Sequence, residues 1–532
     1  MYTKQLGAAS PVTDLIQYPT RMYSSALRLL CLCATLRCYA FAANILFAYD
    51  LPSPSHHIWN YALAEGLMAK GHNVTMLGPF TDRGKRSDKY HPLVTEGILE
   101  AFGRNDQLVL ENFAVVGPLK FMKLFVDYGL VACNHSYHTE GLKTLLDYPK
   151  EFKFDLIILD VTVSACFCPL IQRFGYPPTI GATAFLLPPY LSAPFGNHLH
   201  PSYLPIYFSN YGDNMNFLQR VVNYLFTYTD VILRWNYETQ EVEKIARRSL
   251  GEGMDSMSSL MSRMTLLLCN LDPALTYPQP LPPNIIPVGG LHVKDSKKLP
   301  ADLATIMDNA TNGVVLFALG TNIRSDNLDV RVRKALLDAF AKLKFTVLWK
   351  FESELENVPK NVIIRKWLPQ NDILGHPNTK LFIGHGGALS TFEVIYHAVP
   401  FLAMPFSFDQ KITVDDLVKR KLVIKLDPRS LTSHNFLQSI NEVLNNPTYS
   451  NNIRDVSRRM RDQPESPLDR AVFYAEYAMR HNGAQFFKPQ VERYVVFGVV
   501  ICRCCALSAI PRWRRRLSSH YRGQKNQYMH KT

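Results

Sequence analysis

The sequence has little cysteine in the part that would form its core. Ten cysteines occur in 532 residues, and only Cys133, Cys166, Cys168 and Cys269 lie away from the two ends. Four cysteines over such a length are too few for a disulfide scaffold. Cys166 and Cys168 are separated by one phenylalanine, which is not zinc-ligand spacing, and they lie in an apolar run. We therefore predict that they are buried thiols.

The chain also lacks a basic stripe, although its formal net charge is +13. Much of the excess positive charge lies in the last stretch, at Arg512, Arg514, Arg515, Arg516, Arg522, Lys525 and Lys531. No basic segment interleaved with aromatic residues occurs in the body, which argues against nucleic-acid binding. The sequence contains no Asp-X-Asp box, no His/Cys cluster with metal-ligand spacing and no short-period repeat. No metal is therefore expected.

The hydrophobic content of 47% is enough for two or three domain cores. Strands and helices alternate along the chain, which predicts an α/β fold with parallel sheets. The expected strands cover 44–49, 74–77, 156–159, 314–319 and 346–349, and the expected helices cover 57–70 and 328–343. A proline-rich bridge at 277–290 separates two halves. Parallel sheets bind ligands beyond the carboxyl ends of their strands, and both His56 and Asp160 stand just past such ends.

Residues 367–410 are the most informative segment. An apolar strand at 380–383 ends at Gly384-His385-Gly386-Gly387, and an apolar helix at 388–397 follows at once. A strand that turns through glycines into a helix directs backbone N–H groups and the positive helix end at one spot, which suits a phosphate. In the same segment Trp367 offers an aromatic face for a base, and Glu393 offers an acceptor for ribose hydroxyls. Asp409 and Gln410 offer a polar pair for sugar hydroxyls. The sequence therefore predicts a nucleotide-sugar site.

The motifs WLPQNDILGHP, HGGALSTFE and DQ closely resemble the signature segment of the UDP-glycosyltransferases, the family of the animal UDP-glucuronosyltransferases. The resemblance runs from about residue 44 to about residue 483. It implies a GT-B fold, in which two Rossmann-like domains face a central cleft and a C-terminal helix crosses back onto the N-terminal domain. The expected organisation is an N-terminal extension with signal peptide (1–43), an acceptor-binding domain (44–285), a UDP-sugar-binding domain (286–452), closing helices that pack on the N-terminal domain (453–485), a degenerate transmembrane segment (494–511) and a basic tail (512–532).

The resemblance also assigns roles to residues. His56 takes the position of the catalytic base and Asp160 that of its partner. Histidine suits this task because it titrates near neutral pH, and a carboxylate on its other nitrogen would stabilise the imidazolium. The residues assigned to the UDP-sugar are Gly320, Thr321, Trp367, Gln370, His385, Gly386, Gly387, Ser390, Glu393, Asp409 and Gln410. The family needs no metal or cofactor besides the UDP-glucose or UDP-glucuronate donor, and the expected reaction is direct displacement with inversion.

Taken without the resemblance, each of these residues also has an ordinary structural role. An isolated histidine at a helix start and an aspartate at a strand end are more often structural than catalytic. Trp367 could pack in a core, and Glu393 could lie on a solvated helix face. The chain departs from the family pattern at Ala318, Ala398, Phe408, Thr413, Lys421 and Val423. Ala398 is a mild change only if its backbone is not left-handed, and Phe408 is expected to narrow the sugar pocket.

Both ends of the chain carry membrane-related signals. Residues 21–43 resemble a secretory signal that ends in Ala40-Phe41-Ala42, and Met22 is an alternative start. The apolar run at 494–510 is close to the short limit for a membrane span of about 17 residues, and Arg503 at its centre counts against insertion. We expect a lumenal protein of the endoplasmic reticulum held by a single membrane pass, with Asn134 and Asn309 as glycosylation acceptors.

The leading hypothesis is a UDP-glycosyltransferase that conjugates small lipophilic molecules, bound by apolar stretches such as 184–189 and 216–224. A second hypothesis is a catalytically weak relative that binds UDP or lipophiles. A third, a sugar-nucleotide epimerase with two Rossmann domains, fits the secretory leader and the glycine-turn segment poorly. The sequence leaves homo-oligomerisation open.

Overall fold

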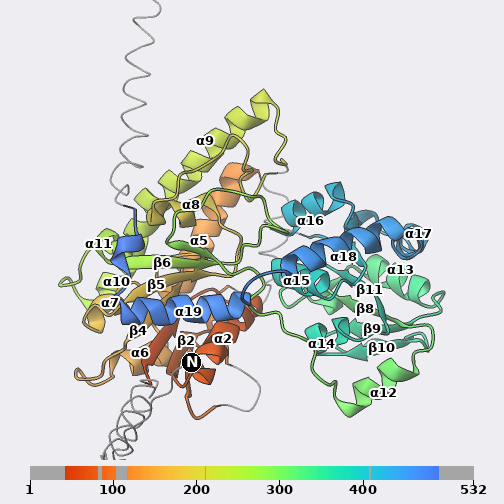
Figure 1. Ribbon diagram of the computed structural model, residues 1–532, viewed down its shortest axis with the longest axis horizontal. Helices are drawn as coiled ribbons and strands as arrows, with labels where there is room; N and C mark the ends of the chain where they lie inside the picture. Colours follow the sequence, from red (N-terminus) through yellow and green to blue (C-terminus); the bar gives the residue numbers. More distant parts are fainter. Residues whose placement is uncertain (1–41, 82–86, 103–116, 210, 407–408, 490–532) are drawn as a thin grey trace, which may run out of the picture. The chain divides into compact units, whose positions relative to one another are not determined.

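The computed structural model describes residues 42–81, 87–102, 117–209, 211–406 and 409–489 (Figure 1). The described residues from Ala43 onward belong to one compact unit. Most of the predicted signal, the run at 494–511, the tail at 512–532 and Phe408 lie outside the described residues. Within the described part, none of the helices combines the length and the apolar character that a membrane crossing requires.

The first half is built on a seven-stranded sheet with the order β3-β2-β1-β4-β5-β6-β7, in which all pairings are parallel. Its strands are β1 (Asn44–Ala48), β2 (Asn73–Gly78), β3 (Tyr90–Val94), β4 (Leu156–Asp160), β5 (Thr179–Thr183), β6 (Met264–Cys269) and β7 (Ile285–Pro287). The interior strands β4, β5 and β6 are buried along their whole length, as expected where helices cover both faces of a parallel sheet. The strand order reverses direction between β1 and β4, which is where such sheets bind ligands.

The helices of this half are α2 (Pro54–Ala69), α3 (Ile98–Ala101), α5 (Pro118–Ser136), α6 (Glu140–Leu146), α7 (Leu170–Arg173), α8 (Pro189–Ser192), α9 (Phe217–Leu233), α10 (Thr239–Leu250) and α11 (Met257–Ser262). A short 3₁₀ helix, η1 (Ala193–Phe195), follows α8, and a π-helical segment, η2 (Arg234–Glu238), joins α9 to α10. Helix α2 begins at Pro54, three residues before the predicted start, because proline is well suited to the first helical turn. Gly71, with φ of 104°, ends it as predicted.

The second half contains a six-stranded parallel sheet with the order β10-β9-β8-β11-β12-β13. Its strands are β8 (Val314–Ala318), β9 (Thr346–Lys350), β10 (Val362–Arg365), β11 (Thr379–Gly384), β12 (Phe401–Ala403) and β13 (Val423–Lys425). Its helices are α12 (Ala301–Asn309), η3 (Ser325–Asn327), α13 (Val330–Phe340), α14 (Gln370–Leu374), α15 (Ala388–Tyr396), α16 (Asp409–Lys419), η4 (Pro428–Ser430), α17 (Ser433–Asn445) and α18 (Pro447–Arg461). Here the order reverses between β8 and β11.

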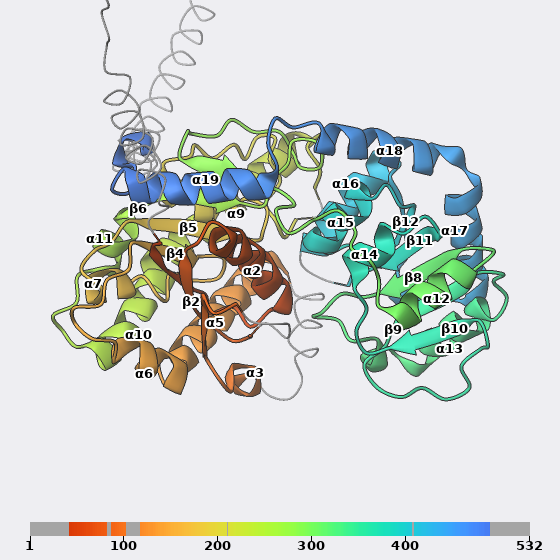
Figure 2. The same ribbon diagram turned by 60° about the horizontal axis from the view of Figure 1, so that its bottom comes forward.

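The last described helices are divided between the two halves. Helix α19 (Pro467–Arg480), followed by η5 (Gln485–Phe487), packs on α2 and on the first sheet, and Val472 joins the core there. Figure 2 shows α19 lying along this half, as the expected crossing-back helix should. Helix α18 departs from the expectation for residues 453–485, because Ile453 and Met460 pack in the core of the second half. The predicted domain boundary at 285/286 falls inside β7, the edge strand of the first sheet.

Candidate active site

The first candidate residues lie at the carboxyl edge of the first sheet, where its strand order reverses. His56 follows β1 in the first turn of α2, and Asp160 is the last residue of β4. Since β1 and β4 are neighbouring parallel strands, the residues just past their ends come together. Nδ1 of His56 lies 3.0 Å from Oδ2 of Asp160, and both side chains are buried. The two residues that the resemblance assigned to the reaction therefore form a hydrogen-bonded pair.

Two further residues, which sequence reasoning missed, hold the Asp160 carboxylate. Asn60 donates from Nδ2 to Oδ2 over 2.8 Å, and Thr162 donates to Oδ1 from its backbone N–H over 3.0 Å and from its hydroxyl over 2.5 Å. Burial by itself would raise the pKa of Asp160. The charge of His56 and the hydrogen bonds from His56, Thr162 and Asn60 instead lower this pKa below its usual value. Asn60 could have been found from sequence, because it lies four residues after His56 on the same helix face.

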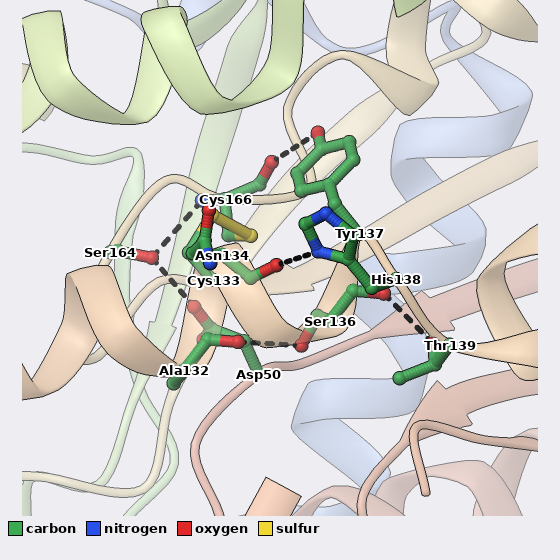
Figure 3. The surroundings of a disulfide bond; sticks show 10 residues. All are labelled: Asp50, Ala132, Cys133, Asn134, Ser136, Tyr137, His138, Thr139, Ser164 and Cys166. Carbon is green, nitrogen blue, oxygen red and sulfur yellow. Dashed lines mark hydrogen bonds between the residues drawn. A yellow bond between two sulfur atoms is a disulfide. The ribbon is translucent and has the colours of Figure 1, made fainter. Parts of the chain in front are cut away.

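The loop after Asp160 is connected by hydrogen bonds to the loop after β1 (Figure 3). Ser164 donates from its hydroxyl to Oδ2 of Asp50 over 2.6 Å, and the backbone N–H of Cys166 donates to the Ser164 hydroxyl over 3.2 Å. Asp50 lies two residues beyond β1, so this bond connects the loop that leads to His56 with the loop that follows Asp160. Burial raises the pKa of Asp50 to about 7, in spite of the opposing hydrogen bond from Ser164.

The expectation that Cys166 is a buried thiol is wrong, because a disulfide joins it to Cys133 of α5 (Figure 3). The two residues are 33 positions apart in sequence, yet their Cα atoms are 5.5 Å apart, a proximity that only the packing of α5 against the sheet creates. Cys168 is free and buried, as expected, and Cys269 is free and buried as well. Among the described residues, Asp50, Cys133 and Cys166 are close enough to share a metal ion. They do not fit one, because the two sulfurs are bonded to each other and neither is a thiolate.

The donor candidates gather at the corresponding edge of the second sheet. Gly320 follows β8 and His385 follows β11, and these strands are parallel neighbours. A Cβ on Gly320 would lie 2.4 Å from the His385 ring, and a Cβ on Gly387 would lie 2.3 Å from it. Gly320 and Gly386 also have left-handed φ values of 85° and 79°, which favour glycine. The glycines of both turns therefore let the backbone close around the imidazole of His385.

His385 is a neutral hydrogen-bonding group at neutral pH. Burial, with a smaller contribution from the charge of Lys350, lowers the pKa of His385 to about 4. Its Nδ1 is buried and has no hydrogen-bond partner among the described residues. Helix α15 begins three residues later at Ala388, so its free backbone N–H groups and the positive end of its dipole lie beside the imidazole. This arrangement suits an anionic group such as a diphosphate.

Gln370, Ser390 and Glu393 form one hydrogen-bonded group beside this turn. Nε2 of Gln370 donates to the hydroxyl of Ser390 over 3.0 Å and also to Oε2 of Glu393. Burial raises the pKa of Glu393 to about 7, against the lowering effect of the bond from Gln370. Glu393 is thus not on a solvated helix face. Trp367 is 56% exposed and lines the adjacent cleft, which excludes the alternative that it packs in a core.

The two residues predicted to contact the sugar, Asp409 and Gln410, lie at the start of α16. Gln410 is buried, and its Oε1 accepts a hydrogen bond from the backbone N–H of Phe406 over 2.9 Å. Asp409 is the first residue of the helix, and its side chain lies outside the described part. Two of the departures from the family pattern affect the backbone: Ala398 and Lys421 have φ values of 55° and 53°. Because the backbone of Ala398 is left-handed, alanine in place of the family's glycine is not a mild change at this position.

One cleft of about 960 Å³ is lined by residues of both halves, among them His56, Gly320, Thr321, Trp367, Gln370, His385, Gly387, Ser390, Glu393 and Gln410. Asp160 lies behind His56 and does not line this cleft. The halves also contact each other directly: Asn322 donates to the hydroxyl of Ser53 over 3.0 Å, and Lys294 pairs with Glu65 over 2.6 Å. His56 and His385 thus share one cleft.

An apolar pocket of about 110 Å³ adjoins this cleft, and Phe125 and Phe185 line both. The Phe185 ring meets His56 edge-on, with 5.2 Å between ring centroids. Residues 185–189 of the stretch expected to bind acceptors line the pocket. The second expected stretch, 216–224, lines neither cavity, and its Phe217 and Leu218 are 78% and 69% exposed.

Comparison with known proteins agrees with this geometry. The sequence model described as "UDP-glucoronosyl and UDP-glucosyl transferase" matches residues 95–497. The chain is 34% identical over 448 residues to UDP-glucosyltransferase 2 of Dactylopius coccus, with 82% of this chain and 84% of that protein covered. It is 30% identical over 464 residues to human UDP-glucuronosyltransferase 2B17, with the same shares covered.

Solved structures show the same fold at low sequence identity. The calicheamicin glycosyltransferase matches with a TM-score of 0.55 and 16% identity, covering 83% of this chain and 99% of that one. A UDP-glucosyltransferase from Polygonum tinctorium matches with a TM-score of 0.52 and 14% identity, covering 83% and 99%. The two-sheet architecture is therefore the GT-B fold.

Proposed function

Because the chain belongs to the UDP-glycosyltransferase family and is a hexosyltransferase of animal type, we propose that it moves glucose or glucuronic acid onto a hydroxyl group of small lipophilic acceptors. His56 is the proposed base, Asp160 its partner, and the configuration of the anomeric carbon is inverted. The observation that carries this proposal is the cleft that holds His56 on one side and His385 with its glycine turns on the other.

The proposed chemical step uses the two nitrogens of His56 differently. Nδ1 is engaged with Asp160 over 3.0 Å, which leaves Nε2 to take the proton of the acceptor hydroxyl. The acceptor oxygen attacks the anomeric carbon as the bond between that carbon and the UDP oxygen breaks. The imidazolium formed on His56 is stabilised by the Asp160 carboxylate, whose lowered pKa keeps it ionised.

The proposed donor site stabilises the departing UDP with preorganised hydrogen-bond donors. His385 and the backbone N–H groups of Gly386 and Gly387 would face the diphosphate, where charge develops during the reaction. Trp367 would stack on the uracil with Gln370 at its edge, and Glu393 would accept from the ribose hydroxyls. Thr321 and Ser390 would lie beside the diphosphate, and Asp409 and Gln410 would contact the sugar hydroxyls. These donors would supply the stabilisation without a metal ion.

The proposed acceptor site is the apolar pocket beside His56. Phe125 and Phe185 form its wall toward the cleft, with ring centroids 6.4 Å apart and nearly parallel planes. An aromatic or aliphatic acceptor that fills this pocket would place its hydroxyl next to the His56 ring, because Phe185 contacts that ring. Burial of apolar acceptor surface would then supply the binding free energy.

We also propose that the protein works in the lumen of the endoplasmic reticulum at the membrane surface. Support comes from α9, where Phe217, Leu218, Tyr224 and Leu225 are all exposed on one helix although they are large and apolar. Such a face suits the interfacial layer of a bilayer. Co-sedimentation of the full chain with phospholipid vesicles, compared with a variant carrying serine at these four positions, tests the contribution of this helix.

The function itself is tested by incubating the purified protein with UDP-glucose or UDP-glucuronate and a panel of phenols, and measuring UDP release. We expect acceptor-dependent UDP release that falls by roughly 10²–10⁴-fold in the His56→Ala variant, while UDP-sugar binding stays unchanged. Tight binding of the donor without turnover on any acceptor, or full activity of the His56→Ala variant, would overturn the proposal.

A further inference from the structure

A buried ion cluster lies next to the loop that follows Asp160, and its residues have no role in the proton transfer proposed above. Asp230, Arg234 and Glu238 are all buried, at the junction of α9 and η2. Nη1 of Arg234 lies 3.0 Å from Oε2 of Glu238, and Nε lies 3.6 Å from Oδ1 of Asp230. Burying charges carries a large desolvation cost, and proteins with apolar residues of similar volume in place of such a cluster are often as stable. Stability alone therefore does not account for this cluster.

The cluster is anchored to the loop that follows Asp160. Nη1 of Arg234 donates to the backbone carbonyl of Val163 over 3.1 Å. The Tyr190 hydroxyl donates to the preceding carbonyl, that of Thr162, over 2.6 Å, and the Arg234 guanidinium lies over the Tyr190 ring at 3.8 Å from its centroid. Thr162 in turn donates twice to the Asp160 carboxylate. Two successive carbonyls of the loop are thus held by Arg234 and by the tyrosine that packs against it.

The same guanidinium also supports the wall of the apolar pocket. It lies 4.9 Å from the ring centroid of Phe125, within the range of a cation–π contact. Phe125 stacks on Phe185, and Phe185 contacts His56. Tyr207, which lines the pocket as well, donates to Oδ1 of Asp230 over 3.2 Å. The cluster therefore contacts both the loop that holds the carboxylate and the aromatic side chains that would touch the acceptor.

Two of the three cluster residues, Arg234 and Glu238, lie in a π-helical segment. Segment η2 spans Arg234–Glu238 and interrupts the α-helical run from Phe217 to Leu250. Such segments are rare and frequently occur at functional sites. Glu238 pairs with Arg234 and also lies close to Gly129 of α5, where an added Cβ would lie 3.3 Å from Oε1 of Glu238 and 3.1 Å from the Val163 carbonyl. Glycine at position 129 is what allows α5 to approach so closely.

We propose that Arg234 is a positioning residue of the reaction, whose single buried guanidinium fixes the Asp160 loop and the aromatic wall of the acceptor pocket in one geometry. This inference rests on the proposed function, because it assigns Arg234 to the support of the His56–Asp160 pair. Arg234 does not line the cleft, so it acts through Val163, Tyr190 and Phe125.

The test compares variants that remain folded. Because Arg234→Met alone would leave two buried carboxylates unpaired, the central variant combines it with Asp230→Asn and Glu238→Gln, which removes all three charges together. Its matched control is Arg247→Met on α10, an arginine that also pairs with a carboxylate four residues away but contacts neither the loop nor the pocket. Circular dichroism and thermal unfolding establish that each variant is folded.

We expect the neutral triple variant to keep its affinity for the UDP-sugar and to turn over para-nitrophenol roughly 10–100-fold more slowly, with a raised KM for the acceptor. Arg234→Lys should lie between this variant and the wild type, because one ammonium cannot reach all of these partners. Arg247→Met should match the wild type. If the folded triple variant keeps wild-type kcat and acceptor KM while His56→Ala is inactive, the inference about Arg234 is wrong. If His56→Ala is itself active, the proposed function fails instead.

Discussion

At the carboxyl edge of the first sheet, both oxygens of the Asp160 carboxylate have hydrogen-bond partners, whereas at the same edge of the second sheet Nδ1 of His385 has none among the described residues. The first edge is held from behind by a disulfide, the Asp50–Ser164 bond and the Arg234 cluster. At the second edge, Gly320 and Gly387 lie so close to the His385 ring that a Cβ at either position would clash with it.

This difference fits the separate tasks that the two edges have in the proposed reaction, proton transfer at the first and donor binding at the second. Groups that must transfer a proton benefit from fixed geometry before the substrate arrives. Groups that must bind a diphosphate need unfilled hydrogen-bonding capacity and room, because the ligand itself completes the site. Substitutions at the first edge should therefore change turnover, and substitutions at the second should change donor affinity.

The largest expected effect comes from Asp160→Asn, which removes the charge that, in the proposed mechanism, stabilises the imidazolium of His56. We expect kcat to fall by roughly 10³–10⁴-fold with little change in UDP-sugar affinity. Thr162→Val, which removes only the hydroxyl bond to the same carboxylate, should cost much less, about tenfold. Steady-state kinetics and calorimetry measure both quantities. A loss of less than about tenfold for Asp160→Asn would show that this edge is not the site of proton transfer.

The next effect separates the donor edge from the rest of the molecule. In Gly387→Ala the new Cβ would lie 2.3 Å from the His385 ring, so we expect UDP-sugar affinity to fall about 10–100-fold through displacement of that ring. Gly117→Ala is the matched control: Gly117 caps α5 with φ and ψ of −67° and 163°, close to the −65° and 151° of Gly387, yet no atom of the described residues lies within 4 Å of its Cβ position. Equal donor affinity in both variants would contradict the proposed role of His385.

A pH dependence of donor binding should follow from Glu393. Burial raises the pKa of Glu393 to about 7, so the carboxylate that is proposed to accept from ribose is present above that value and is lost as the pH falls through it. We expect UDP-sugar affinity to fall by up to about tenfold per pH unit below pH 7. His385, with a pKa of about 4, stays neutral over most of this range. Calorimetric titration at several pH values checks this, and Glu393→Gln should remove the dependence. A pH-independent affinity in the wild type would exclude Glu393 from the donor site.

The smallest effect concerns backbone strain in the second half. Lys421 is exposed and has a left-handed φ of 53°, so Lys421→Gly should stabilise the protein by up to about 1 kcal/mol. Ala398→Gly should be close to neutral, because relief of strain is offset by the loss of a partly buried methyl group. Asn357→Gly, at a φ of 56°, is the control, since asparagine tolerates this conformation. Thermal unfolding measures all three, and destabilisation by Lys421→Gly would contradict the strain argument.

Much of the fold could be predicted from the sequence, because its signals are local. Apolar runs that end at Asp160 and at Gly384, and the helix that stops at Gly71, depend on neighbouring residues and appear in the structure close to where they were predicted. The pairing of His56 with Asp160 was expected only from the resemblance. Local patterns do not show which strands are neighbours. The spacing of four residues from His56 could have indicated Asn60, but nothing in the sequence indicated that Thr162 holds the carboxylate of Asp160.

Three other features that were missed depend on contacts between distant segments. The Cys133–Cys166 disulfide, the Asp50–Ser164 bond and the contact of Arg234 with Val163 join residues 33 to 114 positions apart. The stretch 216–224 was predicted to bind acceptors because it is apolar, yet its apolar side chains face outward. Composition shows that a helix has an apolar face, but only packing decides which way that face turns.

By itself the sequence determined the α/β architecture and the glycine turns, since these follow from periodicity and from the backbone freedom of glycine. Only the tertiary structure decided that His56 and His385 line one cleft, and that a buried arginine, a disulfide and a buried aspartate lie behind Asp160. The physical reason is that strand order and helix packing bring the ends of separate strands together, and a linear pattern of residues does not contain that order.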